Sequence, residues 1–383
     1  METEKLYYQD CHLAVFSARV LACAASDRGW EIILDRSAFY PEGGGQAADQ
    51  GTLGGVRVLH TKEVNDSVVH LCDGPLEVGS RVEGRLDWEG RFHRMQQHTG
   101  EHIVSGLIHS RWGFHNTGFH MGGEGITIDF DGVIPASELP WLEAQANRAV
   151  WANLPVKCWI PAKEELEALR YRTKKQLPWP VRIVQIPGCD SCACCGVHTA
   201  FTGEVGLIKL FSAIPFRGGT RMLMACGGHA LQILNDAYRQ NQLVSQAFSV
   251  PMSETGEGAK RMNEQLAALK FQITGLQREK LAALAESYRG RGDVLCFVPE
   301  LDGGLLRELG DRIASLCGGR AAVFAGSDGE GYSYCLVSLS GDLRPLGKQL
   351  NAALNGRGGG KPGSIQGRCS ADRVDIEGFF KSL

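Results

Sequence analysis

Two pairs of metal-binding side chains, far apart in the sequence, place the strongest constraint on the fold of this chain. His98 and His102 lie four residues apart, so a helix would project both imidazoles from one face. Cys194 and His198 are also four residues apart, and the intervening glycine permits a tight turn. Three imidazoles and one thiolate suit tetrahedral Zn²⁺. If one ion takes all four donors, the helix and the turn must meet in space.

Two other zinc sites would use part of the same pattern. A closed structural site could be formed by Cys189, Cys192, Cys194 and Cys195. Their close spacing, without a second separated pair, makes this arrangement less favourable. His98-Thr-Gly-Glu101-His102 also fits the H-x-x-E-H signature of zinc peptidases, in which the glutamate is the general base. Those enzymes take a carboxylate as third ligand, whereas the downstream donors here are a cysteine and a histidine.

Composition excludes several classes of protein. The 383 residues carry 40 basic and 43 acidic side chains, and 43% are hydrophobic, as in a globular rather than a disordered or fibrous chain. A nucleic-acid partner would therefore need a local basic patch. The first residues are polar, unlike a secretory signal, and no apolar run approaches the ~20 residues of a membrane span. We expect a cytoplasmic chain without membrane contact, whose thirteen cysteines are reduced.

Two glycine-rich segments require special backbone geometry. The first, Phe39-Tyr-Pro-Glu-Gly-Gly-Gly-Gln46, contains Gly43, Gly44 and Gly45 in succession. Because such a run does not stabilise a helix or a strand, we expect positive φ or the close approach of another group there. The second segment, 355–368, is expected to be a loop, and it carries the cations Arg357, Lys361 and Arg368 with no acidic residue between them.

Hydrophobic periodicity predicts an α+β protein with four parts. Short runs bounded by turn residues favour an N-terminal β-barrel-like module over residues 1–90, and the period becomes helical near Arg91. Mixed elements then indicate a central α/β, zinc-binding domain over 91–245. A helical coil linker over 246–290 and a C-terminal α/β domain over 291–383 complete the chain.

The helical linker carries a short coiled-coil pattern. Apolar residues recur with 4-3-4-3 spacing at Met262, Leu266, Leu269, Ile273 and Leu276, and Lys280 then breaks the phase. The pattern fits a coil between two chains, a hairpin, or a helix lying on its own domain. The first of these would make the chain a homodimer through the coil and the C-terminal domain.

Three motifs, in this order, resemble those of the alanyl-tRNA editing proteins, free-standing relatives of the editing domain of alanyl-tRNA synthetase. They are the glycine segment ending at Gln46, the helix with His98 and His102, and Cys194-x3-His198 followed by Thr202-Gly-Glu-Val-Gly. The match covers residues 1 to about 240. The remainder is similar to the C-terminal domain of the synthetase, which indicates a long-form member.

The resemblance implies a reaction and a set of site residues. The reaction is hydrolysis of the ester that joins a wrong amino acid, serine or glycine, to the acceptor end of alanine tRNA. One Zn²⁺ per chain would be held by His98, His102, Cys194 and His198. Gln46 would orient water, and Gln46 and Ser37 would distinguish serine from alanine through its hydroxyl group. Substrate contacts are expected from Gly43, Gly44, Gly45 and Arg221.

Two departures from the family pattern bear on these roles. The turn usually reads Cys-Gly-Gly-Thr-His, and here Cys195 and Val197 replace its second and fourth residues. Ser37 stands where the family usually has threonine, so the discrimination between side chains could differ.

A tRNA partner requires cations. One candidate cluster surrounds Tyr171 and includes Arg172 and Lys174, and the second is formed by Arg357, Lys361 and Arg368. Two other functions fit parts of the sequence. One is a zinc-dependent peptidase of the H-x-x-E-H type, and the other is a non-catalytic tRNA-binding module whose zinc is structural.

Overall fold

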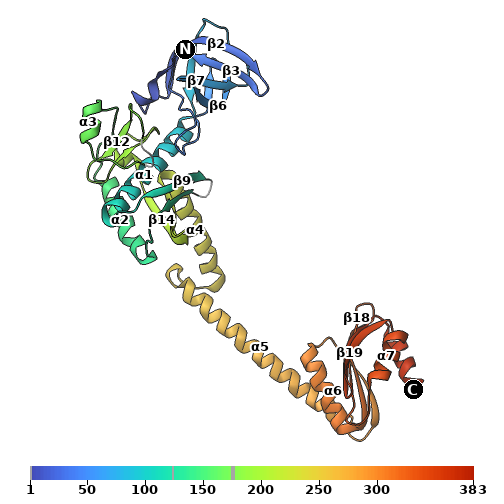
Figure 1. Ribbon diagram of the computed structural model, residues 1–383. Helices are drawn as coiled ribbons and strands as arrows, with labels where there is room; N and C mark the ends of the chain where they lie inside the picture. Colours follow the sequence, from blue (N-terminus) through green and yellow to red (C-terminus); the bar gives the residue numbers. More distant parts are fainter. Residues whose placement is uncertain (1, 123–124, 174–176) are drawn as a thin grey trace. The chain divides into compact units, whose positions relative to one another are not determined.

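The chain divides into two compact units, Met1–Leu243 and Val244–Leu383. The computed structural model describes residues 2–122, 125–173 and 177–383 (Figure 1). Both units combine helices with β-sheets, so the mixed α and β character predicted from the sequence is confirmed. The finer division into four domains remains a prediction.

Six strands at the start of the first unit form a closed barrel in the order β2-β3-β7-β6-β5-β8. Along β8, buried and exposed residues alternate, which places Val82 and Leu86 in the barrel core with Phe16 and Ile32. A short parallel pair, β1 (Glu4–Lys5) and β4 (Arg36–Ser37), lies outside the barrel order, and η1 (Leu6–Tyr8) follows β1. The barrel strands are β2 (Val15–Ser26), β3 (Gly29–Leu34), β5 (Gly51–Leu53), β6 (Val56–Val64), β7 (Ser67–Cys72) and β8 (Arg81–Leu86).

Helix α1 (Trp88–Trp112) follows the barrel directly. Its first turn is capped by the Asp87 side chain, and it ends at Gly113 with a φ of 74°. The two internal glycines, which lower helix propensity by about 1 kcal/mol each, permit close packing. A Cβ atom on Gly100 would lie 2.2 Å from Sγ of Cys226, and one on Gly106 would lie 2.3 Å from the carbonyl oxygen of Cys189.

The rest of the first unit is a four-stranded antiparallel sheet, ordered β14-β15-β10-β9, and a smaller sheet, ordered β11-β12-β13. The core between α1, α2 and the larger sheet includes Ile103, Ile126, Leu142 and Met224. The strands are β9 (Asn116–Gly122), β10 (Gly125–Phe130), β11 (Lys157–Trp159), β12 (Ile183–Ile186), β13 (Asp190–Ala193), β14 (Ile208–Phe216) and β15 (Gly219–Cys226). The helices are η2 (Ala136–Glu138), α2 (Leu139–Trp151), α3 (Lys163–Ala168), η3 (Thr202–Val205) and α4 (Gly227–Phe248).

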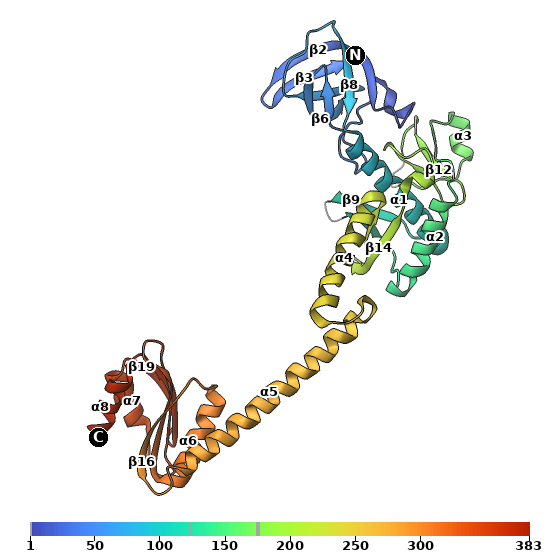
Figure 2. The same ribbon diagram turned by 180° about the vertical axis from the view of Figure 1, so that it is seen from behind.

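The second unit has a five-stranded sheet in the order β16-β17-β18-β20-β19. Helices α7 and α8 cover one face and α6 the other, together with the end of α5 (Figure 2). The strands are β16 (Gly292–Val298), β17 (Gly318–Ser327), β18 (Gly331–Val337), β19 (Gly356–Lys361) and β20 (Ser364–Cys369). The helices are η4 (Met252–Glu254), α5 (Thr255–Glu286), α6 (Gly303–Cys317), α7 (Arg344–Ala353) and α8 (Arg373–Lys381).

The second glycine-rich segment is a β-hairpin, so the predicted loop is wrong. β19 pairs with β20, and β20 pairs in turn with β18, which lies inside the sheet. The ladder of backbone hydrogen bonds stabilises the glycines in extended form. The glycines are required because Tyr334 of β18 packs against them, and a Cβ atom on Gly358 or Gly367 would lie 2.5 Å from its hydroxyl oxygen.

The apolar pattern on α5 faces outward in the single chain. Met262, Leu266, Leu269, Ile273 and Leu276 are between 44% and 65% exposed. The predicted coiled coil and homodimer remain predictions. Across the parts of the chain that the structure describes, every helix is too short or too polar to cross a membrane.

Candidate metal centre

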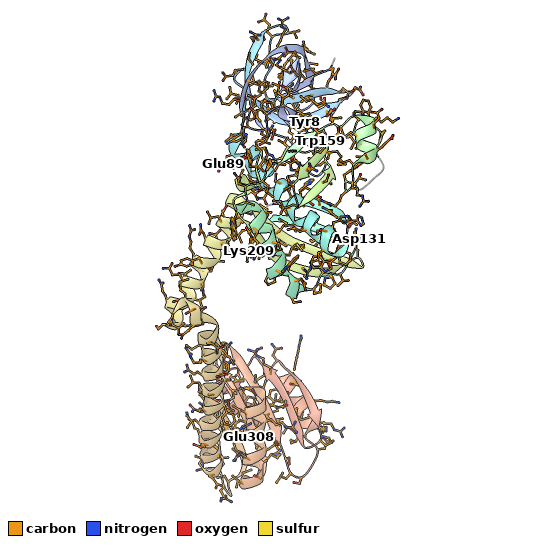
Figure 3. The ribbon with its side chains drawn as sticks, turned by 90° about the vertical axis from the view of Figure 1, so that its left-hand side faces the viewer. Tyr8, Glu89, Asp131, Trp159, Lys209 and Glu308 are labelled. Atoms are coloured by element: carbon orange, nitrogen blue, oxygen red, sulfur yellow. The ribbon has the colours of Figure 1, made fainter. Side chains whose placement is uncertain are left out.

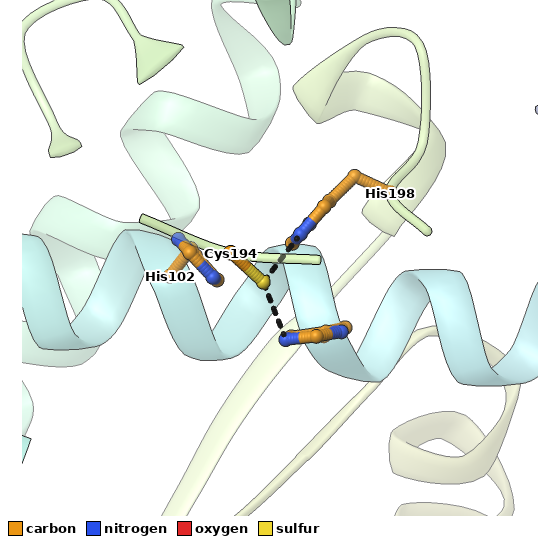
Figure 4. Close-up of side chains that lie close together, drawn as sticks. His102, Cys194 and His198 are labelled. Carbon is orange, nitrogen blue, oxygen red and sulfur yellow. Dashed lines mark hydrogen bonds between the residues drawn. The ribbon is translucent and has the colours of Figure 1, made fainter. Parts of the chain in front are cut away.

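The four residues that the sequence predicts as metal ligands lie together in the first unit. His98 and His102 project from the same face of α1, with their ring centroids 5.3 Å apart. The β12–β13 hairpin leads into the turn that carries Cys194 and His198. Figure 4 shows these two side chains close to His102. All three imidazoles are buried, and the four ligand atoms lie within 4.8 Å of one another.

The spacing of these atoms suits a tetrahedral metal ion. Sγ of Cys194 lies 3.5 Å from Nε2 of His98 and 3.5 Å from Nε2 of His198. Bond lengths of about 2.05 Å for Zn–N and 2.3 Å for Zn–S require an N–S separation of about 3.6 Å at the tetrahedral angle. The donor set therefore fits Zn²⁺ in both chemistry and size.

Each histidine has its Nδ1 atom held by a neighbouring group. Nδ1 of His98 donates to Oε1 of Gln46 at 3.0 Å, and Nδ1 of His102 donates to the carboxylate of Asp190 at 2.9 Å. Nδ1 of His198 contacts the Thr99 hydroxyl at 3.3 Å. These contacts hold the rings so that their Nε2 atoms converge on Cys194. In metal sites, a hydrogen bond to the other ring nitrogen commonly orients a histidine ligand in this way.

Local electrostatics favour the thiolate form of Cys194. Burial alone would raise the pKa of this thiol, but the charge of His98 and the hydrogen bond to His102 hold the pKa well below its ordinary value. Burial likewise opposes the imidazolium form of His102, yet the hydrogen bond to Asp190 raises its pKa well above the ordinary value. A more basic imidazole is a stronger ligand once it loses its proton.

The first glycine segment forms a tight hairpin turn beside the centre. Gly43 and Gln46 exchange backbone hydrogen bonds of 3.1 and 3.0 Å, and φ is positive at Gly44 and Gly45, at 60° and 86°. This geometry is typical of a two-residue type I′ turn. A Cβ atom on Gly45 would lie 2.7 Å from the ring of Phe119. The positive φ and the close approach expected from the sequence are both confirmed.

Gln46 links this hairpin to the metal centre. Its Oε1 atom also accepts from the backbone N–H of Val197 at 3.2 Å, which fixes the orientation of the amide. Its Nε2 atom is buried and has no hydrogen-bond partner among the described residues. A buried donor of this kind normally has a ligand or water to satisfy it.

A cavity of about 600 Å³ opens onto the centre. It is lined by Gly44, His98, His102 and Cys194, and by the polar groups of Glu101 and Asn116. Tyr8, labelled in Figure 3, closes part of the wall: its hydroxyl donates to the carbonyl oxygen of Cys195 at 2.8 Å, and Arg182 lies over its ring at 4.5 Å. The cavity is large enough for an aminoacyl group and part of a nucleotide.

Ser37 lies away from the cavity, inside the protein. Its hydroxyl donates to Nε2 of His70 at 2.8 Å and accepts from the backbone N–H of Phe39 at 3.1 Å. Its predicted contact with substrate therefore has no support from the geometry.

Two of the cationic side chains predicted to contact substrate or tRNA form ion pairs with carboxylates of the protein. Arg221 forms two 2.7 Å hydrogen bonds to Asp129, and Arg172 forms two 2.7 Å hydrogen bonds to Asp190. Arg172 thus supports the His102 side of the metal centre. Lys174 lies outside the described residues. The hairpin of the second unit carries Arg357, Lys361 and Arg368.

The sequence did not identify Asp190, Thr99 or Asn116 as part of the site. Asp190 lies between Cys189 and Cys192 of the predicted cysteine cluster, but its role follows from its contacts with His102 and Arg172. The four cysteines considered as an alternative site do not form one group of ligand atoms: Cys194 lies with three histidines, and Cys192 lies with His102 and Asp190.

Two family models match the chain. The model described as tRNA synthetases class II (A) matches residues 2–90, which include the barrel and the glycine hairpin. The model described as the threonyl and alanyl tRNA synthetase second additional domain matches residues 181–221, which include the Cys194–His198 turn.

Similar proteins cover nearly the whole chain. The alanyl-tRNA editing protein Aarsd1 of Danio rerio is 25% identical over 97% of this chain and 96% of its own length, and that of Mus musculus is 25% identical over 95% and 94%. The alanine–tRNA ligase of Thermofilum pendens is 30% identical over the full chain, which spans 44% of that enzyme. The resemblance found in the sequence is thereby confirmed, and the chain is a relative of the alanyl-tRNA editing proteins over nearly its whole length.

Proposed function

We propose that this chain hydrolyses the ester between a wrong amino acid, serine or glycine, and the acceptor end of alanine tRNA. The observation that carries the proposal is the convergence of His98, His102, Cys194 and His198 at a cavity beside the Gln46 hairpin. The names of the full-length relatives support alanyl-tRNA as the substrate class.

One Zn²⁺ per chain is the proposed cofactor, held by the four converging side chains. When bound, zinc supplies a Lewis acid or lowers the pKa of a bound water towards about 7. Gln46 and Asp190 then act as positioning residues, because they hold the Nδ1 atoms of His98 and His102.

The residues of the hairpin are proposed to position the ester. An aminoacyl ester is already activated, so the protein needs mainly to orient water and to stabilise the developing oxyanion. The Nε2 atom of Gln46, which has no hydrogen-bond partner among the described residues, is the proposed donor for this purpose. The backbone of Gly44 lines the cavity and is proposed to approach the terminal adenosine.

The rest of the tRNA is proposed to contact the cationic hairpin of the second unit. Arg357 and Arg368 lie opposite each other across β19 and β20, and Lys361 ends β19. Phosphate contacts from these side chains would make binding strongly dependent on salt.

One observation favours a second candidate, a non-catalytic tRNA-binding module. Four protein donors would occupy all four coordination positions of a tetrahedral ion, as in structural zinc sites. Catalytic zinc sites usually keep one coordination position open for water or substrate. The peptidase alternative has less support, because Oε1 of Glu101 already accepts hydrogen bonds from Ser105 and Asn116.

Release of serine from mischarged alanine tRNA tests the proposal, with correctly charged alanine tRNA as the control. We expect rapid hydrolysis of the mischarged ester only. Equal hydrolysis of both esters would reject editing, and binding of tRNA without turnover would favour the non-catalytic module.

Cys194→Ala removes the thiolate ligand. We expect zinc content to fall below one per chain. Losing a ligand should weaken metal affinity at least as much as the roughly 10–100-fold loss caused by removing a hydrogen-bond partner of a ligand. Cys195→Ala is the matched control, because this neighbouring thiol is exposed and lies outside the donor group. Full zinc content in Cys194→Ala would contradict the proposed ligand set.

A further inference from the structure

A second group of metal-binding side chains lies in the turn between η1 and β2. Asp10, Cys11 and His12 are consecutive in the sequence, and each offers one ligand atom, with the three atoms within 4.8 Å of one another. The turn is closed by a hydrogen bond of 3.4 Å from the backbone N–H of Leu13 to the carbonyl oxygen of Asp10. Carboxylate, thiolate and imidazole groups all bind Zn²⁺ in proteins. Their ligand atoms form a group separate from the one around Cys194.

A carboxylate from a distant segment fixes the ring of His12. Nε2 of His12 donates to Oε2 of Glu204, a residue of η3, at 2.6 Å. Because a carboxylate oxygen only accepts, Nε2 carries the proton, and Nδ1 of the neutral ring keeps its lone pair. Glu204 is itself held in place, since its Oε1 accepts from the backbone N–H of Phe201 at 2.9 Å. A carboxylate that orients the far nitrogen of a histidine ligand is a common arrangement in metal sites.

The unprotonated nitrogen of His12 faces the other two donors. Nδ1 lies 3.7 Å from Sγ of Cys11, close to the separation of about 3.6 Å that tetrahedral zinc requires. Nδ1 lies 4.0 Å from Oδ1 of Asp10, and the corresponding zinc site requires about 3.4 Å. The Asp10 side chain is 59% exposed and has a second oxygen, so a small rotation brings the carboxylate to the ion.

The surroundings of Cys11 are anionic. Burial raises the pKa of its thiol, and the charges of Glu204 and Asp10 raise it further, to about 11. The same two carboxylates attract a cation to this turn. A bound metal ion reverses their effect on the thiol, because it stabilises the thiolate directly and displaces the proton.

We infer that Asp10, Cys11 and His12 form a second site for a divalent transition metal ion, with Glu204 as the positioning residue of His12. Three protein donors leave the fourth tetrahedral position open to water. Asp10 and His12 are exposed, whereas the histidines around Cys194 are buried, so we expect this site to bind zinc more weakly and to fill after the first equivalent. The inference is independent of the proposed ester hydrolysis.

Titration of the metal-free full chain with zinc, in competition with a chromophoric zinc chelator, tests this inference. We expect two equivalents in the wild type, with the second bound more weakly. Cys11→Ser and His12→Gln should each weaken the second equivalent about tenfold or more and leave the first unchanged. Cys23→Ser is the matched control, because this thiol lies in β2 outside both donor groups. The melting temperature of each metal-free variant establishes that it is folded.

Two further variants separate this site from the buried centre. Cys194→Ala should keep the weaker equivalent, because its donors lie elsewhere, and extensive dialysis should then remove that zinc. The zinc content of dialysed protein therefore reports the buried centre alone. Glu204→Ala leaves all three ligands in place and should still weaken the second equivalent about tenfold, because the ring of His12 loses its anchor. Unchanged affinity in folded Glu204→Ala would contradict the positioning role.

Co²⁺ in place of zinc reports the thiolate ligand directly. The second equivalent should add a thiolate-to-cobalt absorption band in the wild type and in Cys23→Ser, and this added band should be absent in Cys11→Ser. A wild-type chain that binds a single equivalent would overturn the inference. So would a second equivalent without the added band, or one that folded Cys11→Ser and His12→Gln bind as tightly as the wild type.

Discussion

The two runs of three glycines in this protein have similar sequences but adopt different backbone structures. In the first unit, Gly43–Gly45 forms a tight turn with positive φ at Gly44 and Gly45. In the second unit, Gly358–Gly360 lies in an extended edge strand. The first run needs glycine mainly for its backbone angles, and the second needs it for the space that a side chain would fill.

The environment opposite each run decides between the two structures. The turn packs against the ring of Phe119 and the Cys194–His198 segment. The strand packs against Tyr334 and against the neighbouring strand β20, so only alternate glycines face a close neighbour. A glycine run therefore indicates that something approaches the backbone, but the sequence alone does not say what.

Gly45→Val tests the turn and has the largest expected effect. A β-branched residue at a φ of 86° is strained, and its Cβ atom would meet the ring of Phe119 at 2.7 Å. We expect the first unit to lose about 3 kcal/mol of unfolding free energy. Because Gln46 follows directly and holds His98, zinc affinity should fall as well. Urea unfolding and zinc titration measure the two effects.

Gly43→Ala is the matched control within the same turn. Gly43 is outside the positive-φ residues of the chain, and the nearest atom to an added Cβ, the hydroxyl oxygen of Tyr40, would be 3.5 Å away. We expect a change of less than about 1 kcal/mol. Similar losses at both positions would show that the turn tolerates no side chain anywhere, and that the backbone angle is not the deciding factor.

Low pH should destabilise the first unit through a residue type that the second unit lacks, and this is the second largest effect that we expect. Burial lowers the pKa of His70 to about 4. Its ring hydrogen-bonds to Ser37 and to the carbonyl oxygen of Ile32 and packs against Phe39, and none of these groups is charged. The unfolded chain binds this proton near the ordinary value of 6.5. The stabilisation is therefore complete above that pH and decreases as the pH falls towards 4. The first unit should lose about 2 kcal/mol between pH 8 and pH 5 from this residue.

The second unit is an internal reference for this experiment, because residues 244–383 contain no histidine. Urea unfolding followed by limited proteolysis reports each unit through its own fragments. His70→Gln should reduce the acid sensitivity of the first unit by the stated amount and leave the second unit unchanged. Equal acid sensitivity in wild type and variant would show that His70 does not titrate as its burial implies.

Local patterns in the sequence predicted the parts of the site that depend on spacing. The four-residue interval between His98 and His102 requires only a regular helix, and the Cys194–His198 interval requires only a turn. Their convergence followed from the chemistry of a shared ion, and the structure brings them together. The mixed α and β architecture and the first glycine turn could be predicted for the same reason, since each follows from short-range periodicity or from backbone angles.

The parts that were missed depend on contacts between distant segments. Asp190 supports His102 across 88 residues of sequence, and Asn116 is oriented by Glu101 only after β9 has shifted its register. Ser37 is a residue that the sequence predicted for the site but that the tertiary structure directs elsewhere, because its hydroxyl is hydrogen-bonded to His70. Residue type and position predict a candidate, but the partner that gives it a role comes from the tertiary structure.

Gly358→Ala tests the strand and has the smallest expected effect. Its Cβ atom would lie 2.5 Å from the hydroxyl oxygen of Tyr334 and 2.4 Å from the carbonyl oxygen of Gln366, so overpacking should cost about 1.5 kcal/mol in the second unit. Gly359→Ala, one residue further along the strand, meets no atom within 4 Å and should change stability by less than about 0.5 kcal/mol. Urea unfolding of both variants measures the difference. Because the clash alternates along a strand but not along a loop, equal effects at the two positions would favour the loop predicted from the sequence over the hairpin.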